Sequence, residues 1–201
     1  MSNKLVMWFV FFGIGLGVGI LDLWTKEITF EALDVEVDMQ GERPVLKNKN
    51  GLIDPITGGP YQERIVVIQN YFELEATINY GAFNGWFASF TTYLAFISLV
   101  ALVVIAAFLF FASRRIEKTS AWLVIALGLL WAGTFGNFYD RYFIGGVRDF
   151  IKWFVLWDGK PKVWPNFNIA DSAICVGVGI IILIELINIF KKSQSADAPE
   201  C

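Results

Sequence analysis

The sequence has no histidine and only two cysteines among its 201 residues. Without histidine there are no imidazole general bases, Ser-His-Asp triads or His-rich zinc sites. Cys175 lies inside an apolar run and Cys201 is the last residue, which excludes a disulfide framework and a cysteine metal cluster. We therefore expect neither a metal nor another cofactor, and any catalysis must depend on Asp, Glu, Lys, Ser, Thr or Tyr side chains.

Charge is also scarce. Charged residues make up 17% of the chain and hydrophobic residues 56%, against about 25% and about 45–50% in an average soluble domain. The mean hydropathy is +0.55. These values exclude a disordered chain, a coiled coil and an ordinary soluble globule. The net charge of −3, with no basic stripe, argues against a nucleic-acid partner.

Four long runs of the chain are almost free of charge. They cover residues 5–21, 85–112, 121–139 and 172–190, the last interrupted only by Glu185. Each is near the ~20 residues that cross a ~30 Å hydrocarbon core as a helix. We therefore expect an all-α membrane protein, a single membrane domain over 1–201. Its four transmembrane helices are expected at about 5–24, 86–112, 121–139 and 171–190.

The first run is expected to be a membrane anchor. It is longer than the ~7–15 apolar residues of a cleaved signal peptide, and no small-x-small cleavage site follows it. Lysine and arginine in short connections then predict the orientation. Six basic residues fall on one side of the four runs, which we expect to be cytosolic: Lys4, Arg114, Arg115, Lys118, Lys191 and Lys192. Both termini and a tail at 191–201 are expected on that side, where Glu185 can snorkel in a structural role.

The two remaining connections are expected to face outward. Residues 34–63 are polar with Gly, Pro and Asn, which predicts a loop or a short hairpin insert. Residues 72–78 alternate between apolar and polar, the period of a half-buried strand. A small extracytoplasmic β-sheet and loop subdomain is therefore expected at about 27–84. The aromatic residues of 140–171 predict a belt at the lipid–water interface.

Unusual polar residues gather at the outer ends of the four runs. They are Asp22, Lys26, Asn79, Asn137, Asp140, Arg141, Asp149, Asn168 and Asp171. Ionisable groups at membrane depth are costly, so their collection at one face is a functional-site hypothesis. Structural alternatives are a helix cap for Asp171 and Asn168, a charge pair for Asp140 and Arg141, an i,i+4 pair for Asp22 and Lys26, and a turn at 79–81.

Asp149 is the hardest of these residues to explain structurally, because it lies between apolar neighbours and needs a partner or a raised pKa. Two carboxylates held together cannot both ionise easily. The ionised member can activate water while the protonated member polarises a peptide carbonyl, which hydrolyses an amide without histidine, cysteine or metal. Asp149 and Asp171, on segments joined by one loop, are the best pair.

Two other readings stay open. A Ser/Lys peptidase would use Ser172 or Thr25 with Lys26. A small membrane transporter or assembly factor is the non-enzymatic alternative, because carboxylates in spans often mark proton paths. Only Glu185 continues the polar positions across the membrane core, which counts against a conduit.

Five motifs occur in order at the expected helix ends. They are Asp22-Leu-Trp-Thr-Lys26, Asn79-Tyr-Gly-Ala-Phe83, Gly136-Asn-Phe-Tyr-Asp-Arg141, Val147-Arg-Asp-Phe-Ile151 and Phe167-Asn-Ile-Ala-Asp-Ser172. In this order they resemble the bacterial lipoprotein signal peptidase (signal peptidase II) family. The resemblance implies a four-helix aspartic endopeptidase of the inner membrane. Such an enzyme cuts prolipoproteins N-terminal to a diacylglyceryl-modified cysteine, working as a monomer among membrane lipids.

The resemblance also implies roles for the site residues. The catalytic pair falls on Asp149 and Asp171, and Asp22 with Lys26 falls on fold-supporting positions. Substrate and backbone positioning falls on Asn79, Asn137, Asp140, Arg141 and Asn168, with Asp140 holding Arg141. Three features depart from the family pattern: the long insert at 34–63, Phe83 directly after Ala82, and Arg148 beside the catalytic aspartate, where a cation would favour ionisation and lower the dyad pKa.

Overall fold

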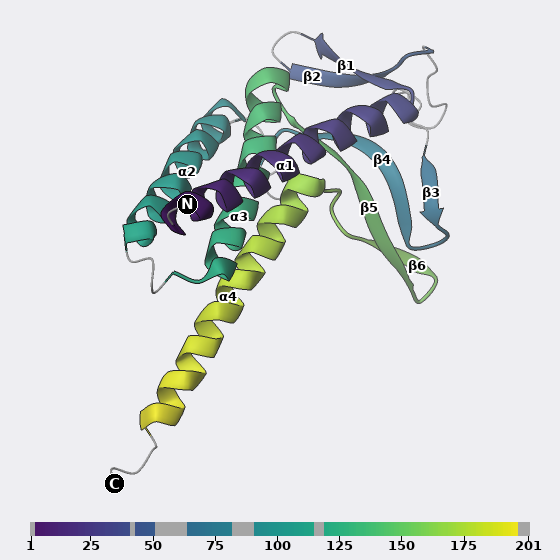
Figure 1. Ribbon diagram of the computed structural model, residues 1–201. Helices are drawn as coiled ribbons and strands as arrows, with labels where there is room; N and C mark the ends of the chain where they lie inside the picture. Colours follow the sequence, from purple (N-terminus) through teal and green to yellow (C-terminus); the bar gives the residue numbers. More distant parts are fainter. Residues whose placement is uncertain (1–2, 41–42, 51–63, 82–90, 115–118, 197–201) are drawn as a thin grey trace.

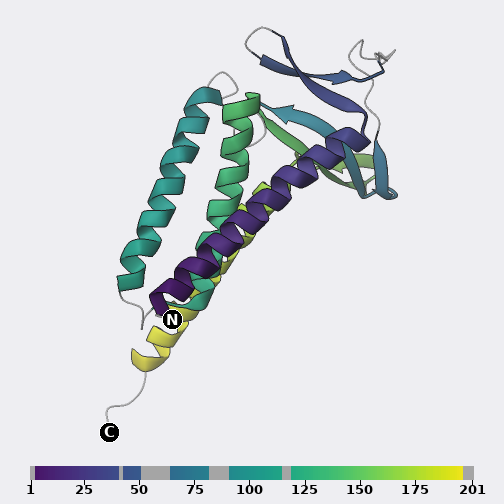
Figure 2. The ribbon, with the colours of Figure 1, turned by 45° about the horizontal axis from the view of Figure 1, so that its top comes forward.

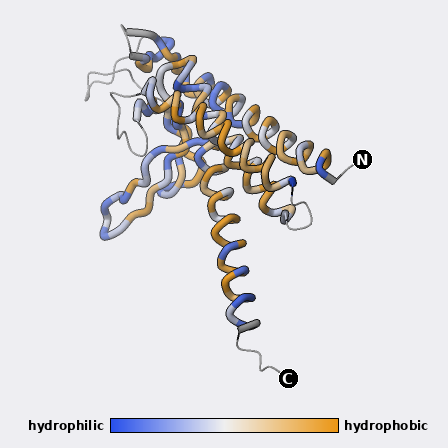
Figure 3. Tube along the Cα trace, turned by 90° about the vertical axis from the view of Figure 1, so that its left-hand side faces the viewer, coloured by the Kyte–Doolittle hydropathy of each residue, from blue (hydrophilic) through white to orange (hydrophobic). Residues whose placement is uncertain are grey.

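The structure is a computed structural model that describes residues 3–40, 43–50, 64–81, 91–114 and 119–196. Within these residues, four helices are long and apolar enough to cross a membrane. They are α1 (Asn3–Ala32), α2 (Thr91–Ala112), α3 (Ala121–Tyr139) and α4 (Ile169–Ala196) (Figure 1). The helices carry most of the apolar sequence, as Figure 3 shows, and the protein is a membrane protein.

The helices lie where the apolar runs predict them, but two are longer than expected. α3 has the predicted bounds, whereas α1 continues to Ala32 and α4 to Ala196. At about 1.5 Å per residue, α1 extends about 45 Å, more than a ~30 Å hydrocarbon core. Its last turns therefore occupy the start of the region expected to form the sheet subdomain. The expected residues 86–90 of the second span and 197–201 of the tail lie outside the described chain.

Two antiparallel sheets lie at one end of the helix bundle (Figures 1 and 2). The smaller is a hairpin of β1 (Val35–Gln40) and β2 (Arg43–Asn48). The larger has the order β3-β4-β5-β6, with β3 (Ile65–Ile68), β4 (Phe72–Asn79), β5 (Val147–Trp157) and β6 (Lys160–Val163). The expected all-α class is therefore right only for the spanning part.

One hairpin and one further strand were predictable. The hairpin expected in the 34–63 insert is confirmed for β1 and β2, while 51–63 lies outside the described residues. The strand expected over 72–78 is confirmed as β4, which pairs with both β3 and β5.

Residues 147–163, within the segment expected to form an aromatic belt, form the hairpin of β5 and β6, which was not predicted. Alternation does not reveal β5, because its outer half is apolar on both faces of the strand. The turn does carry a signal: Asp158 and Gly159 have φ of 50° and 71°. An Asp-Gly pair with positive φ at both residues is favoured in two-residue hairpin turns.

α3 packs against the other three helices. Gly15 and Gly19 of α1 allow a close approach, because they lie against Trp131 and Phe135 of α3. The two aromatic rings stack with centroids 5.5 Å apart. This packing fixes α1 against α3 below the level of the sheets.

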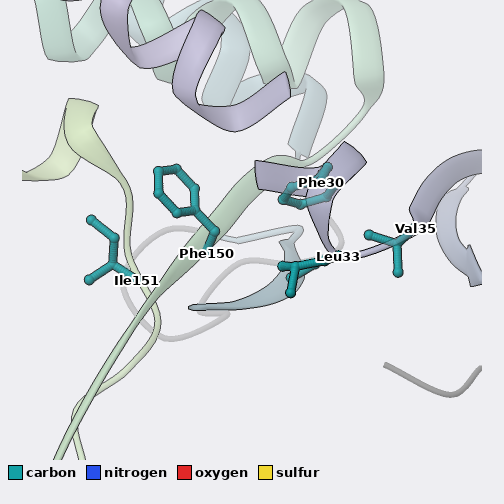
Figure 4. Close-up of a cluster of buried hydrophobic side chains, with 6 residues drawn as sticks. Phe30, Leu33, Val35, Phe150 and Ile151 are labelled. Atoms are coloured by element: carbon teal, nitrogen blue, oxygen red, sulfur yellow. The ribbon is translucent and has the colours of Figure 1, made fainter. Parts of the chain in front are cut away.

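A cluster of buried apolar side chains fastens β5 to the end of α1 (Figure 4). It consists of Phe30, Leu33, Val35, Ala76, Phe150 and Ile151. Phe150 and Ile151 directly follow Asp149 along β5, so burial of these side chains holds the strand in place next to that carboxylate.

Gly136 on α3 leaves no room for a side chain, because a Cβ there would overlap the carboxylate of Asp22. We expect Gly136→Ala to lower the free energy of unfolding by about 1–3 kcal/mol through overpacking. Thermal unfolding in detergent measures this. Gly17→Ala is the matched control on α1, since a Cβ there has no heavy atom within 4 Å. Equal effects of the two substitutions would contradict the close packing.

Candidate active site

The structure brings all of the predicted site residues into one connected network of hydrogen bonds and ion pairs. The network draws on the outer half of α1, the end of β4, the end of α3 and the π-helical turn η4 (Asp140–Ile144), the start of β5 and the start of α4. These elements meet at the end of the bundle where the sheets lie (Figures 1 and 2). The helix ends expected to lie at one face are therefore neighbours in the structure.

The carboxylate of Asp149 is almost fully buried, with 2% of the residue exposed. Asn168 donates its side-chain N–H to Asp149 Oδ1 at 2.7 Å, and Asn79 donates to Oδ2 at 3.1 Å. The β4–β5 register places Thr77 opposite Asp149, and the Thr77 hydroxyl donates to the Asp149 backbone carbonyl at 3.2 Å. Both carboxylate oxygens are thus held by neutral amides.

Asp171 belongs to the first turn of α4, and its cap interpretation needs a correction. Asn168 is the residue before the helix, and it forms a reciprocal capping box with Asp171. The Asn168 backbone N–H donates to Asp171 Oδ2 at 3.2 Å, and the Asp171 backbone N–H donates to Asn168 Oδ1 at 2.9 Å. Asn137 also donates to Asp171 Oδ1 at 2.8 Å. Asp171 therefore takes part in the N-terminal cap of α4 and also contacts Asn137 of α3.

The two carboxylates are joined through these amides. Asn168 Nδ2 also donates to Asn137 Oδ1 at 3.2 Å, so Asp149 and Asp171 are linked by two asparagines. The backbone supports the link, since Phe167 and Ile151 exchange N–H···O=C bonds of 2.9 and 3.1 Å. β5 and the start of α4 are therefore held side by side.

The environment of Asp149 favours the protonated form of its carboxyl group. Burial, and then the charge of Asp171, raise the pKa of Asp149 to about 7. The hydrogen bond from Asn79, the charge of Lys26 and the hydrogen bond from Asn168 lower the pKa, but less strongly. The electrostatic effect of Asp171 indicates that the two carboxylates share one site.

A set of buried ion pairs, here called the buried charge layer, contacts the segments that carry the two carboxylates. Lys26 Nζ is 2.7 Å from Asp22 Oδ2 and 3.1 Å from Asp140 Oδ2, with all three side chains fully buried. Asp22 also accepts the backbone N–H of Ala170, at 2.8 Å. The predicted i,i+4 pair on α1 is confirmed, and it anchors the start of α4.

Asp140 does not hold Arg141 as the resemblance implied. Its carboxylate accepts from the Arg148 backbone N–H at 3.0 Å and from the Arg148 guanidinium at 3.0 and 3.3 Å. Arg141 instead donates to the backbone carbonyls of Asn137, at 3.3 Å, and Gly81, at 3.1 Å. Among the described residues, no ion pair joins Asp140 and Arg141.

The expected effect of Arg148 on the dyad is also wrong. Successive side chains of a strand point to opposite faces, and the Arg148 guanidinium turns to Asp140 and to Glu27, 2.8 Å away. Arg148 does not lower the pKa of Asp149, which is raised. Arg148 instead fastens β5 to η4 and α1.

Other interpretations are resolved by the contacts. Asn79 makes the expected turn, accepting the Gly81 backbone N–H at 3.1 Å, and also binds Asp149. The hydroxyls of Ser172 and Thr25 donate to backbone carbonyls of their own helices. Because Lys26 is paired with carboxylates, the geometry does not support a Ser/Lys peptidase.

Thr77, Glu27 and the Gly81 carbonyl are site contacts that sequence reasoning missed. Thr77 lies in the predicted strand, so its position opposite Asp149 would have followed from the strand pairing alone. Glu27 and Gly81 give no such signal, because their roles depend on where Arg148 and Arg141 point. Throughout the described ranges, no three Cys, Asp or Glu side chains gather closely enough to hold a metal ion.

The buried charge layer gives a stability prediction. We expect Asp140→Asn to lower the free energy of unfolding by about 3–5 kcal/mol, because Lys26 and Arg148 lose a charge partner in a buried site. Chemical or thermal unfolding in detergent measures this. Asp38→Asn breaks an ion pair with Lys47 whose side chains are 40% and 48% exposed, and should change little. A small effect at Asp140 would show that the layer does not stabilise the fold.

Comparison with known proteins identifies the family. A family model described as signal peptidase (SPase) II matches residues 14–187. The lipoprotein signal peptidase of Anaeromyxobacter sp. (strain Fw109-5) is 35% identical over 170 residues, covering 81% of this chain and 78% of that protein. The lipoprotein signal peptidase of Rhodopirellula baltica is 35% identical over 187 residues, covering 88% of this chain and 70% of that protein.

Solved structures agree. A bacterial membrane enzyme determined by the in meso method at 2.3 Å resolution aligns with a TM-score of 0.60 and 25% identity, over 94% of this chain and 91% of that chain. A second, at 1.9 Å resolution, aligns with a TM-score of 0.57 and 27% identity, over 86% and 90%. Since the family model spans most of the sequence and the relatives agree with it, the resemblance is confirmed, and the chain belongs to the signal peptidase II family.

Proposed function

We propose that this protein is an aspartic endopeptidase that removes signal peptides from diacylglyceryl-modified prolipoproteins. The observation that carries the proposal is the pair of carboxylates, Asp149 and Asp171, joined through Asn168 and Asn137. Family membership supports lipoprotein signal-peptide cleavage. It does not favour the alternative of a small transporter or assembly factor.

The two carboxylates would take different roles in hydrolysis. Because the pKa of Asp149 is raised, we assign it as the protonated member, which donates a hydrogen bond to the scissile carbonyl oxygen. Asp171 is less buried and would accept a proton from the attacking water. The water oxygen forms a bond to the carbonyl carbon. When the C–N bond breaks, the proton held by Asp171 passes to the departing cysteine nitrogen.

The surrounding amides and Arg141 would position the substrate. Asn79, Asn137 and Asn168 fix the carboxylates without placing a cation on them. Arg141 orders the Gly81 carbonyl beside the site, and within the described chain its buried Nε has no hydrogen-bond partner. That N–H is free to donate to a substrate carbonyl.

The proposed topology places this site at the extracytoplasmic face of the bacterial inner membrane. The start of α1, the end of α2 and the end of α4 lie at the end of the bundle away from the sheets (Figures 1 and 2). These helix ends carry Lys4, Arg114 and Lys191. Basic residues in the short connection and the chain ends support cytosolic placement of that end and of both termini, because the rule weakens for the long loops at the other end. The lipidated cysteine would keep its acyl chains in the bilayer, and a monomer would suffice, because one chain supplies every site residue.

The dyad is tested by conservative substitution. We expect Asp149→Asn and Asp171→Asn each to lower kcat by about 10³-fold or more, because each removes a proton-transfer group while keeping the side-chain size. Cleavage of a diacylglyceryl prolipoprotein in liposomes measures this, with substrate binding retained better than turnover. Near-native cleavage by either variant would falsify the dyad. Ser172→Ala is the control that should stay active.

The raised pKa gives a pH prediction. Asp149 must keep its proton to act as the acid, so kcat should fall as pH rises through about 7. Removing the Asn79 hydrogen bond removes a contact that stabilises the charged carboxylate, so Asn79→Ala raises the Asp149 pKa and should move the alkaline limb of the kcat profile to higher pH. If the alkaline limb of the Asn79→Ala profile stays in place or moves to lower pH, the assignment of Asp149 as the acid is contradicted.

A further inference from the structure

The C-terminal half of α4 carries a carboxylate that the proposed mechanism does not use. Glu185 is exposed on α4, within the segment that is long and apolar enough to span a membrane. Among the described residues it makes no hydrogen bond or ion pair. An ionisable side chain inside a spanning segment is costly and marks a candidate binding position for a charged partner.

Glu185 lies on the same face of α4 as Asp171. The two residues are fourteen positions apart, and at 3.6 residues per turn this is about 3.9 turns, so their directions around the helix differ by only about 40°. The rise of about 1.5 Å per residue separates them by about 21 Å along the axis. One face of α4 therefore has a catalytic carboxylate at one end and an unpaired carboxylate near the other.

The face between the two carboxylates is apolar and uncovered. Val178 is 42% exposed and Ile182 54% exposed, and both lie within about 40° of the line from Asp171 to Glu185. Figures 1 and 3 show this half of α4 extending beyond the other helices. The face is an apolar strip open to a further helix.

We propose that this strip, the 171–185 face of α4, binds the signal helix of the substrate, with Glu185 pairing the basic residues at the start of the signal peptide. The proposal rests on the proposed function, because Asp171 sets where the scissile bond lies. Secretory signal peptides have a positively charged first region, about 7–15 apolar residues and then the cleavage site. The strip has the complementary order: a carboxylate, an apolar surface and the cleavage site.

The lengths also match. Fourteen helical residues span about 21 Å, and a shorter apolar helix reaches the same distance when the few residues before the scissile bond are extended at about 3.3 Å each. The next charges on α4, Lys191 and Lys192, lie about two turns further on. A cation at the end of the signal helix would therefore meet Glu185 first.

The test uses the full-length enzyme in phosphatidylcholine vesicles, whose zwitterionic headgroups do not compete for basic residues. Three diacylglyceryl prolipoproteins differ only in the first region of the signal peptide, which carries two lysines, two glutamines or two glutamates. We expect Glu185→Gln to raise KM for the lysine substrate about two- to fivefold, the scale of a partly exposed ion pair. The Glu185→Gln substitution should change neither kcat nor the KM for the glutamine substrate.

A charge exchange makes the test specific. The Glu185→Lys enzyme should cleave the glutamate substrate with a lower KM than the lysine substrate. This reverses the preference of the unmodified enzyme, which should have the lower KM for the lysine substrate. If a substitution of Glu185 changed KM equally for all three substrates, the proposed pairing of Glu185 with the signal peptide would be overturned. Loss of cleavage of every substrate by the unmodified enzyme would instead overturn the proposed function, so the two failures are distinguishable.

A crosslinking measurement tests the strip itself. A photoreactive benzoylphenylalanine at position 182, in Asp149→Asn enzyme loaded with substrate, should crosslink to the signal peptide. The same group at 183 is the control, because Leu183 is equally open, at 58% exposed, and points to the other side of α4. The proposal would be overturned if position 182 crosslinked only to lipid or only to a second copy of the chain. Equal crosslinking of positions 182 and 183 to the substrate would also overturn it.

Discussion

The side-chain amide of Asn168 is the contact on which the site depends. Its oxygen accepts the Asp171 backbone N–H and so begins α4, while its nitrogen donates to Asp149 on β5 and to Asn137 on α3. An asparagine can do this because one amide carries two donors and an acceptor. Elements far apart in the sequence meet at this group, and the distance between the two carboxylates follows from where it holds them.

The site also separates neutral hydrogen-bond donors from cations. The carboxylates accept from asparagine amides, whereas Lys26 is paired with Asp22 and Asp140, and Arg148 with Asp140 and Glu27. A cation bonded to Asp149 would stabilise its charged form and lower its pKa. Because Lys26 and Arg148 are paired with other carboxylates, burial and the charge of Asp171 dominate and raise the pKa of Asp149. The buried ion pairs thus support the proposed catalytic pair without neutralising it.

Much of this arrangement could be predicted from the sequence, and the failures have identifiable causes. Apolar run length predicts the four spanning helices, and polar residues at one level of those runs predict which side chains meet. Pairing within the site was predicted less well: Arg148 took the place expected for Arg141 beside Asp140. The cause is geometric, since adjacent residues of a helix do not face each other and Arg148 reaches Asp140 from β5, a strand that was not predicted. Strand β5 was missed because its outer half is apolar on both faces and so has no alternation to detect.

The account depends most on the electrostatic coupling of Asp149 and Asp171 in a buried site. A direct test follows the ¹³Cγ resonance of Asp149 by NMR in specifically labelled enzyme across pH, with and without Asp171→Asn. We predict that the Asp149 carboxyl titrates near pH 7 and that removing the Asp171 charge lowers this value, with burial keeping it above that of a free aspartate. A carboxyl that titrates near pH 4 in both proteins, with no response to Asp171, would contradict the claim that the two groups form one catalytic pair.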